Sequence, residues 1–205
     1  MDLNEMFNLP DKVTLTDVGR NCECEASIIE VTRDIAKHQM DAVWWQIGGS
    51  KSARRNEGDH AWNWTAIVGD ARLDRFAKLV AVQTADGQIQ GAMKYLFDGE
   101  SLLEPGEPSI FVEYLAAAPQ NRDWLVNPPK YRGVGTALIF YAVCDSWISG
   151  RRGRITLVSL SSEKTREFYT RRGFSEVSTL EDGNVEFEMT SVAAERWLRQ
   201  QGMLR

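Results

Sequence analysis

The chain has 205 residues, of which 43% are hydrophobic and 26% are charged, and its formal net charge at pH 7 is −5. These values are typical of a soluble globular protein that is long enough to bury a core as a single domain. The negative balance argues against a broad nucleic-acid-binding surface, because such a surface needs clustered Lys and Arg.

Only three cysteines occur, Cys22, Cys24 and Cys144, and the only histidines are His38 and His60. So sparse a set predicts reduced thiols and neither a disulfide framework nor a metal site. No apolar run approaches the roughly 20 residues of a membrane-spanning helix. The N-terminal stretch MDLNEMFNLP is too acidic for a signal peptide. We therefore expect a cytoplasmic protein without a membrane partner.

The first part of the chain predicts helices. A short strand or irregular lead-in is expected around Val13–Val18. Apolar residues then recur at steps of three and four over 27–47, which predicts a helix stopped by Gly48-Gly49. After a polar loop, Asp59 is a candidate N-cap for a second short helix over 60–68, which Gly69 would close.

The pattern then changes to alternating strands and helices. Two strands, 76–84 and 88–97, flank the hairpin turn signal Asp86-Gly87. The later elements are expected in this order: a strand over 109–118, an irregular stretch to 129, a helix to about Ile148, a strand over 154–160, a helix over 162–172, strands over 174–180 and 184–190, and a helix over 191–201 capped by Thr190 or Ser191. This order predicts a mixed α/β domain in which helical crossovers join parallel central strands.

A charged, glycine-spaced run stands at the start of the helix that follows residue 130: Arg132, Gly133, Val134, Gly135, Thr136 and Ala137. The first N–H groups of a helix lack intrahelical acceptors and lie at the positive end of its dipole, so such a turn suits phosphate. The glycines let ligand oxygens approach the backbone. Position 138 is Leu, and no Gly-Lys-Ser/Thr follows, so neither the dinucleotide fingerprint nor the phosphate-loop signature is complete. A glycine-tolerant entry into a core helix is the alternative.

These residues resemble the GNAT family of N-acetyltransferases. YRGVGTAL fits the acetyl-CoA signature Arg/Gln-x-x-Gly-x-Gly/Ala, and FVEYLAAAP (111–119) is similar to the family's central strand. SSEKTREFYTRRGF (161–174) is similar to the segment in which a tyrosine, here Tyr169, stands four residues before Gly-Phe. Together the matches cover roughly residues 76–190.

The resemblance implies a GNAT fold, with a mixed central sheet of about six to seven strands, flanking helices, and central strands splayed to admit acyl-CoA. It implies a single domain over 1–205, with a helical acceptor-side portion (1–75), an acetyl-CoA-binding core (76–190) and a C-terminal helix (191–205). Acetyl-CoA would be the co-substrate, without a metal. Dimers are common in the family, and the sequence leaves the oligomeric state open.

The resemblance also assigns the cofactor contacts. Backbone groups of Leu115 and Ala117 would pair with the pantetheine arm, and the N–H groups from Gly133 to Ala137 would hold the pyrophosphate beside Arg132. Ser162 stands where many members have Asn, so its shorter side chain would make a weaker contact. The chain also carries an unusually long loop over 120–130, which either covers the cofactor, shapes the acceptor pocket or is inert.

Acetyl transfer to an amine needs a base, because an alkylammonium of pKa about 10.4 is only about a thousandth deprotonated near neutral pH. Glu113 is the candidate, since it lies within an apolar strand on the face of Leu115 and Ala117, where burial would raise its pKa. Tyr169 is the candidate acid for the departing sulfur, because a phenol stays protonated at neutral pH. The alternatives are a structural glutamate at a sheet edge and a core tyrosine.

The resemblance therefore predicts an N-acetyltransferase that moves acetyl from acetyl-CoA to a primary amine by direct attack. A non-catalytic acyl-CoA sensor or assembly module, and a transferase for a different acyl group, remain open. The acceptor is not specified. Four tryptophans, Trp44, Trp45, Trp62 and Trp64, either line an acceptor pocket or pack helices onto the sheet.

Overall fold

The computed structural model describes residues 8–46 and 57–204, and the chain forms two compact units. The N-terminal unit comprises Pro10–Lys94 and Tyr114–Ile139. The C-terminal unit comprises Tyr95–Glu113 and Phe140–Arg205, with the start of the chain. The division of 1–205 into acceptor-side, cofactor and terminal portions stays a prediction.

The N-terminal unit contains strands in the order β6-β1-β2-β3-β4. Their bounds are β1 Lys12–Asp17, β2 Cys22–Glu30, β3 Ala77–Thr84, β4 Ile89–Glu100 and β6 Tyr131–Arg132. β1 pairs antiparallel with β2 and β6, and β2 pairs antiparallel with β3. The predicted turn between β3 and β4 is confirmed, since Gly87 has a φ of 78° and its N–H donates to the Thr84 carbonyl.

The prediction of one helix over 27–47 is wrong at its start. Residues 27–30 belong to β2, which pairs through Ala26–Glu30 with Val80–Thr84 of β3. The helical spacing of Ile28 and Val31 was fortuitous, because cross-strand pairing and packing of β-branched residues override local periodicity. Helical structure begins only at α1 (Arg33–Ile35) and continues as the π-helical turn η2 (Ala36–Asp41) and the short η3 (Trp44–Gln46). The predicted stop at Gly48-Gly49 lies outside the described residues.

The second predicted helix exists as α3 (Trp64–Leu73), but with a different start and end. Asn63 is its N-cap, and its side chain accepts a hydrogen bond from the Ala66 N–H at 2.8 Å. The Asp41 carboxylate adds a cap from η2, accepting from the N–H groups of Trp64 and Thr65 at 2.8 and 2.9 Å. The predicted cap, Asp59, is instead paired with Arg122.

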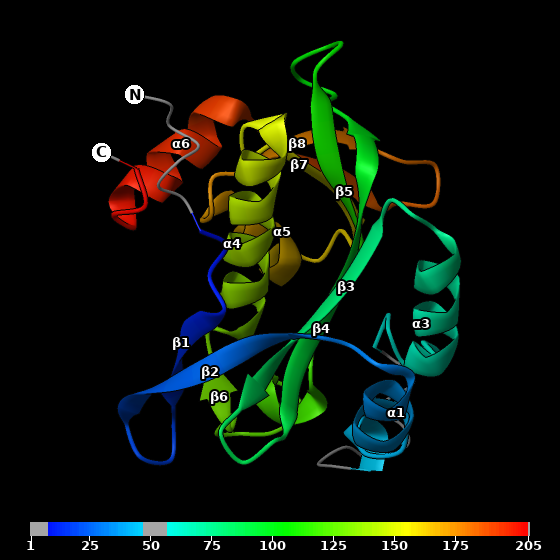
Figure 1. The fold of residues 1–205 in the computed structure, drawn as a ribbon, viewed down its shortest axis with the longest axis vertical. Coiled ribbons are helices and arrows are strands. Elements are labelled where there is room, and N and C mark those ends of the chain that lie inside the picture. The colour runs from blue at the N-terminus through cyan, green and yellow to red at the C-terminus, as the bar shows by residue number, and fades with distance from the viewer. Residues whose placement is uncertain (1–7, 47–56, 205) are drawn as a thin grey trace. The chain divides into compact units, whose positions relative to one another are not determined.

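The tryptophans of the N-terminal unit mainly build its core, as the packing alternative predicted. α1 and α3 lie next to each other beside β3 (Figure 1). Trp44 and Trp64 are buried between these elements with their rings 5.4 Å apart in a T-shaped arrangement. Trp62 and Trp45 are only partly buried at the edge of the same cluster.

The C-terminal unit is built on the strand order β5-β7-β9-β8 beside the end of β4. The bounds are β5 Pro108–Ala117, β7 Ile155–Ser159, β8 Ser175–Thr179 and β9 Val185–Met189, with helices α4 Val134–Ser146, α5 Glu163–Thr170 and α6 Ser191–Gln200. β5 belongs to this unit only as far as Glu113, and α4 only from Phe140. These elements match the predicted ones closely, and Thr190 is the N-cap of α6, accepting from the Ala193 N–H. β7 and β9 are antiparallel, as are β8 and β9.

The predicted parallel crossover is confirmed at β5 and β7, which are joined by α4. Their paired residues run from Ile110–Ile155 to Val112–Leu157, although β7 continues to Ser159. Within the C-terminal unit the pairing of β5 with β7 therefore ends at Val112, one residue before Glu113, as the predicted splay of the central strands requires.

The sheet contains nine strands among the described residues, two more than the upper prediction of seven. The additional strands are β2 and the two-residue β6. The mixed α/β class with flanking helices is confirmed. No helix of the described part of the chain is long and apolar enough to cross a membrane.

Candidate functional site

The predicted phosphate loop forms a strand–turn–helix corner in the N-terminal unit. Arg132 ends β6, opposite Thr16 of β1, and α4 begins two residues later at Val134. Gly133 has a φ of 92°, a left-handed conformation that favours glycine. The first helical hydrogen bond runs from the Ala137 N–H to the Gly133 carbonyl at 2.8 Å. The N–H groups of the residues between them therefore have no acceptor within the helix.

The surface of this corner is accessible. Arg132 and Gly133 are exposed, and Gly135 and Thr136 are half-buried. A Cβ placed on Gly133 would lie 3.9 Å from the Thr14 carbonyl oxygen, which is an ordinary contact. The protein therefore leaves room above Gly133, and the helix dipole and Arg132 favour an anion there.

The first turns of α4 pack directly on β4 at Gly91. A Cβ on Gly91 would lie 2.5 Å from Val134 Cγ1 and 2.9 Å from the Ala116 carbonyl oxygen. Gly91 thus allows a close approach of α4 to β4 next to the end of β5. The structure therefore brings the predicted phosphate loop together with the predicted pantetheine strand, Leu115 and Ala117, in one unit.

The Ala117 carbonyl has a partner within the protein that the sequence did not reveal. Arg122 Nε and Nη2 both donate to this oxygen, at 2.9 and 2.7 Å. The prediction that Ala117 pairs with pantetheine through this carbonyl must therefore be corrected, and a pairing through its N–H stays a prediction. Leu115 is half-buried on the same face of β5.

Arg122 is buried and is neutralised by two carboxylates from the segment before α3. Its Nη1 donates to Glu57 Oε2 at 2.7 Å and to Asp59 Oδ1 at 2.8 Å, and Nη2 pairs with Asp59 Oδ2. Burial alone would lower the pKa of the Arg122 guanidinium, but the bonds and charges of Asp59 and Glu57 outweigh it and hold the pKa above its ordinary value. This ion-pair cluster joins residues 57–59 to the end of β5.

The insertion over 120–130 is fixed at both ends. The Asn121 side chain donates to the Gln90 carbonyl at 2.9 Å and accepts from the Tyr131 N–H at 3.0 Å. The Lys130 N–H donates to the Gln120 carbonyl at 2.9 Å. Because Tyr131 immediately precedes Arg132, these bonds hold the start of the phosphate loop against β4. The insertion therefore supports the loop structurally, and its predicted alternatives, a cover for the cofactor, a part of the acceptor pocket or an inert segment, stay open.

Glu113 does not have the buried position that its apolar neighbours suggested. Its side chain is exposed, whereas Val112 and Ala116, on the other face of β5, are buried. The expectation that this glutamate is buried is therefore wrong. The face that carries Glu113 is the open one, so a ligand on this face has access to its carboxylate.

Tyr169 lies on α5 in an aromatic environment. The centroid of its ring is 5.0 Å from the ring centroids of both Phe168 and Phe187. Burial raises the pKa of Tyr169 to about 12, against the opposing effects of a hydrogen bond with Ser159 and of the Arg172 charge. The phenol is therefore protonated throughout the physiological pH range, as a proton donor must be.

Ser162 is the N-cap of α5. Its Oγ accepts from the Thr165 N–H at 3.2 Å and shares a hydrogen bond of 2.7 Å with Thr165 Oγ1. The hydroxyl therefore has a structural task already, and its predicted contact with CoA stays a prediction.

No protein-family model matches the sequence, and no curated protein matches it. Solved structures do match the fold. An acetyltransferase from Thermus thermophilus aligns with a TM-score of 0.56 and 14% identity, covering 80% of this chain and 95% of its own. A GNAT-family acetyltransferase described as putative, from Bordetella pertussis, aligns with a TM-score of 0.54 and 16% identity over 80% and 95% of the two chains. The chain has the GNAT fold.

A third GNAT neighbour has a ligand and a partner. A mutant of the AtaT toxin, bound to the C-terminus of the antitoxin AtaR and to acetyl-CoA, aligns with a TM-score of 0.56 and 16% identity. The alignment covers 83% of this chain and 96% of the toxin. At these identities the likeness establishes the fold, and the activity of this GNAT-fold chain has to be argued from its own residues.

Proposed function

We propose that this protein is a member of the GNAT family and an N-acetyltransferase, which moves the acetyl group of acetyl-CoA to a primary amine. The observation that carries the proposal is the corner at Gly133, where an accessible helix N-terminus with an adjacent arginine meets the end of β5. The GNAT fold and the acetyl-CoA bound to one GNAT neighbour support the same conclusion.

In the proposed reaction the amine nitrogen attacks the thioester carbonyl carbon, so that a C–N bond forms and the C–S bond breaks. Glu113 accepts the proton that leaves the nitrogen, directly or through water, and Tyr169 donates a proton to the departing sulfur. Backbone N–H groups from Gly133 to Thr136 bind the diphosphate of CoA. The Ala137 N–H, which was also predicted to do so, instead donates to the Gly133 carbonyl. No covalent enzyme intermediate is required.

A methyl group on Gly133 tests the role of the phosphate loop. Gly133→Ala should weaken CoA binding by about tenfold or more, because a charge-assisted hydrogen bond contributes roughly 1.5–3 kcal/mol. Thr136→Val, which removes only a hydroxyl, should have a smaller effect. Both affinities are measured by calorimetric titration of CoA into folded protein.

Gly183→Ala is the matched control for Gly133→Ala. Gly183 also has a positive φ, 83°, and nothing lies within 4 Å of an added Cβ. Both substitutions should therefore destabilise the fold by about 1–2 kcal/mol through the same backbone strain. Only Gly133→Ala should weaken the binding of CoA. Equal CoA affinities in the two variants would refute the assigned role of the loop.

The role of Glu113 is tested by the pH dependence of turnover. A base must be deprotonated to act, so the rate of the native protein should fall as the pH is lowered. Glu113→Gln should abolish this acidic limb and lower kcat by about 10²-fold or more. Glu23→Gln, at an exposed position of β2, is the control. An unaltered profile in Glu113→Gln would assign this glutamate a structural role.

A further inference from the structure

A cavity lies in the N-terminal unit, apart from the corner at Gly133. It has a volume of about 460 Å³ and is bounded by η2 and η3, by the β3–β4 turn, and by Gln120 in the short helix η4 (Pro119–Asn121). Its lining combines polar residues with the apolar side chains of Val43, Trp44 and Ile89. A cavity of this size is within the range of about 300–1,000 Å³ that small-molecule sites occupy.

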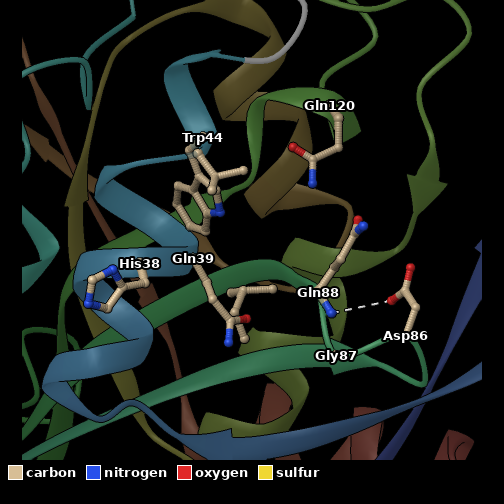
Figure 2. A pocket seen from close by; sticks show the side chains of 9 residues that line it. His38, Gln39, Trp44, Asp86, Gly87, Gln88 and Gln120 are labelled. Atoms are coloured by element: carbon tan, nitrogen blue, oxygen red, sulfur yellow. Dashed lines mark hydrogen bonds between the residues drawn. The ribbon is translucent and has the colours of Figure 1, made fainter.

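Two buried polar atoms at this cavity have no hydrogen-bond partner among the described residues. They are the indole Nε1 of Trp44 and the side-chain oxygen Oε1 of Gln120, whose side chains are exposed by only 1% and 7%. Figure 2 shows both side chains facing the same space from different elements. Unpaired buried polar groups are uncommon, because each costs about 1–3 kcal/mol.

The orientation of Gln120 is fixed by its neighbours. Its Nε2 donates to Gln90 Oε1 at 3.2 Å, and Gln90 Nε2 donates to Thr84 Oγ1 at 2.9 Å. If the oxygen and nitrogen of the Gln120 amide were exchanged, its oxygen would face Gln90 Oε1, and two acceptors would be in contact. The oxygen of Gln120 is therefore the atom left without a partner.

Charges at the rim of the cavity are already compensated. Lys130 Nζ lies 3.7 Å from Asp86 Oδ2 and donates to Gln88 Oε1 at 2.9 Å. Asp86 also accepts from Thr84 Oγ1 at 2.6 Å and from the Gln88 N–H at 3.3 Å, the second of which is drawn in Figure 2. The Thr84 bond is the main cause that lowers the pKa of Asp86 below its ordinary value.

The two unpaired groups define the ligand by its hydrogen-bonding capacity. The Trp44 N–H needs an acceptor, whereas Gln120 Oε1 needs a donor. A carboxylate would leave Gln120 unsatisfied, and an ammonium group would leave Trp44 unsatisfied. A carboxamide has a donor and an acceptor on separate atoms of a flat group. Because the group is uncharged, its transfer from water to a partly apolar cavity costs less than that of an ion.

We propose that this cavity is a binding site for an uncharged amide group of a small molecule, whose carbonyl accepts from Trp44 Nε1 and whose N–H donates to Gln120 Oε1. The inference does not depend on the proposed acetyltransferase activity, because it rests on residues outside the corner at Gly133.

The test uses the indole N–H signals of ¹⁵N-labelled full-length protein, with the Trp44 signal assigned from Trp44→Phe. N-methylacetamide should shift this signal saturably. Acetate, which can only accept hydrogen bonds, and methylammonium, which can only donate them, should not shift the signal. Isopropanol should bind more weakly than the amide. Gln120→Met should weaken binding of N-methylacetamide by about three- to tenfold, the effect of one hydrogen bond.

Gln46→Met, at an exposed glutamine of η3, is the matched control and should bind the amide like the native protein. If Gln120→Met does not fold, Gln120→Asn serves instead, because its side chain keeps the amide but is one methylene shorter, so that the acceptor oxygen no longer reaches the ligand. The same loss of affinity is expected. The proposal is overturned if N-methylacetamide gives no saturable shift, if acetate, methylammonium or isopropanol binds as well, or if the Gln120 variants bind the amide unchanged.

Discussion

Replacing Tyr169 by Phe should lower kcat by about 10²–10⁴-fold, the usual contribution of a positioned acid. The KM for acetyl-CoA should change little, because the lost hydroxyl acts on the departing sulfur. The aromatic packing against Phe168, Phe174 and Phe187 is retained, so the stability of the fold should change little. The measurement is the rate of CoA release with a panel of primary amines.

Tyr141→Phe is the control for Tyr169→Phe, since it also removes a buried hydroxyl that is hydrogen-bonded to a neighbour, here Tyr95. It should leave kcat unchanged. A Tyr169→Phe variant that turns over as fast as the native protein would exclude Tyr169 as the acid. A native protein that binds CoA but turns over no amine would identify a sensor instead of an enzyme.

Replacing Arg122 by Met should destabilise the protein by about 3–5 kcal/mol, because the buried Asp59 carboxylate and the partly buried Glu57 carboxylate would both lose their cationic partner. The Ala117 carbonyl would also lose both of its donors. The free energy of unfolding is measured by urea denaturation. Arg122→Lys keeps the charge but not the forked geometry, so an intermediate loss is expected.

The matched control is Arg166→Met, which breaks a partly exposed pair with Glu176 and should destabilise the fold by no more than about 1 kcal/mol. Combining Arg122→Met with Glu57→Gln and Asp59→Asn should restore part of the lost stability, because the unpaired charges are removed. Equal losses in Arg122→Met and Arg166→Met would mean that the buried cluster contributes no more than a surface ion pair.

Features with a local signature were predictable from the sequence. The Asp86-Gly87 turn indicated the β3–β4 hairpin, and Thr190 indicated the start of α6, because each acts through bonds within a few residues. The glycine run likewise indicated a turn at the start of α4, where the structure places Gly133 with a positive φ. In all three cases the residue type and the backbone conformation it favours agree with the fold.

Features that depend on distant partners were not predictable. β2 is a strand because β1 and β3 pair with it, and β6 is only two residues long. Arg122 and Asp59 are 63 residues apart, and no spacing rule relates them. The exposure of Glu113 depends on which face of β5 is covered, a property that alternation along one strand does not decide.

The most direct test of the proposed function compares CoA with pantetheine, which has the same arm but lacks the diphosphate, by calorimetric titration into folded protein. If Arg132 and the N–H groups from Gly133 to Thr136 bind the diphosphate, CoA should bind at least about 100-fold more tightly, since two charge-assisted bonds of roughly 1.5–3 kcal/mol are at stake. Equal affinities, or no heat with CoA at millimolar concentration, would contradict the proposal.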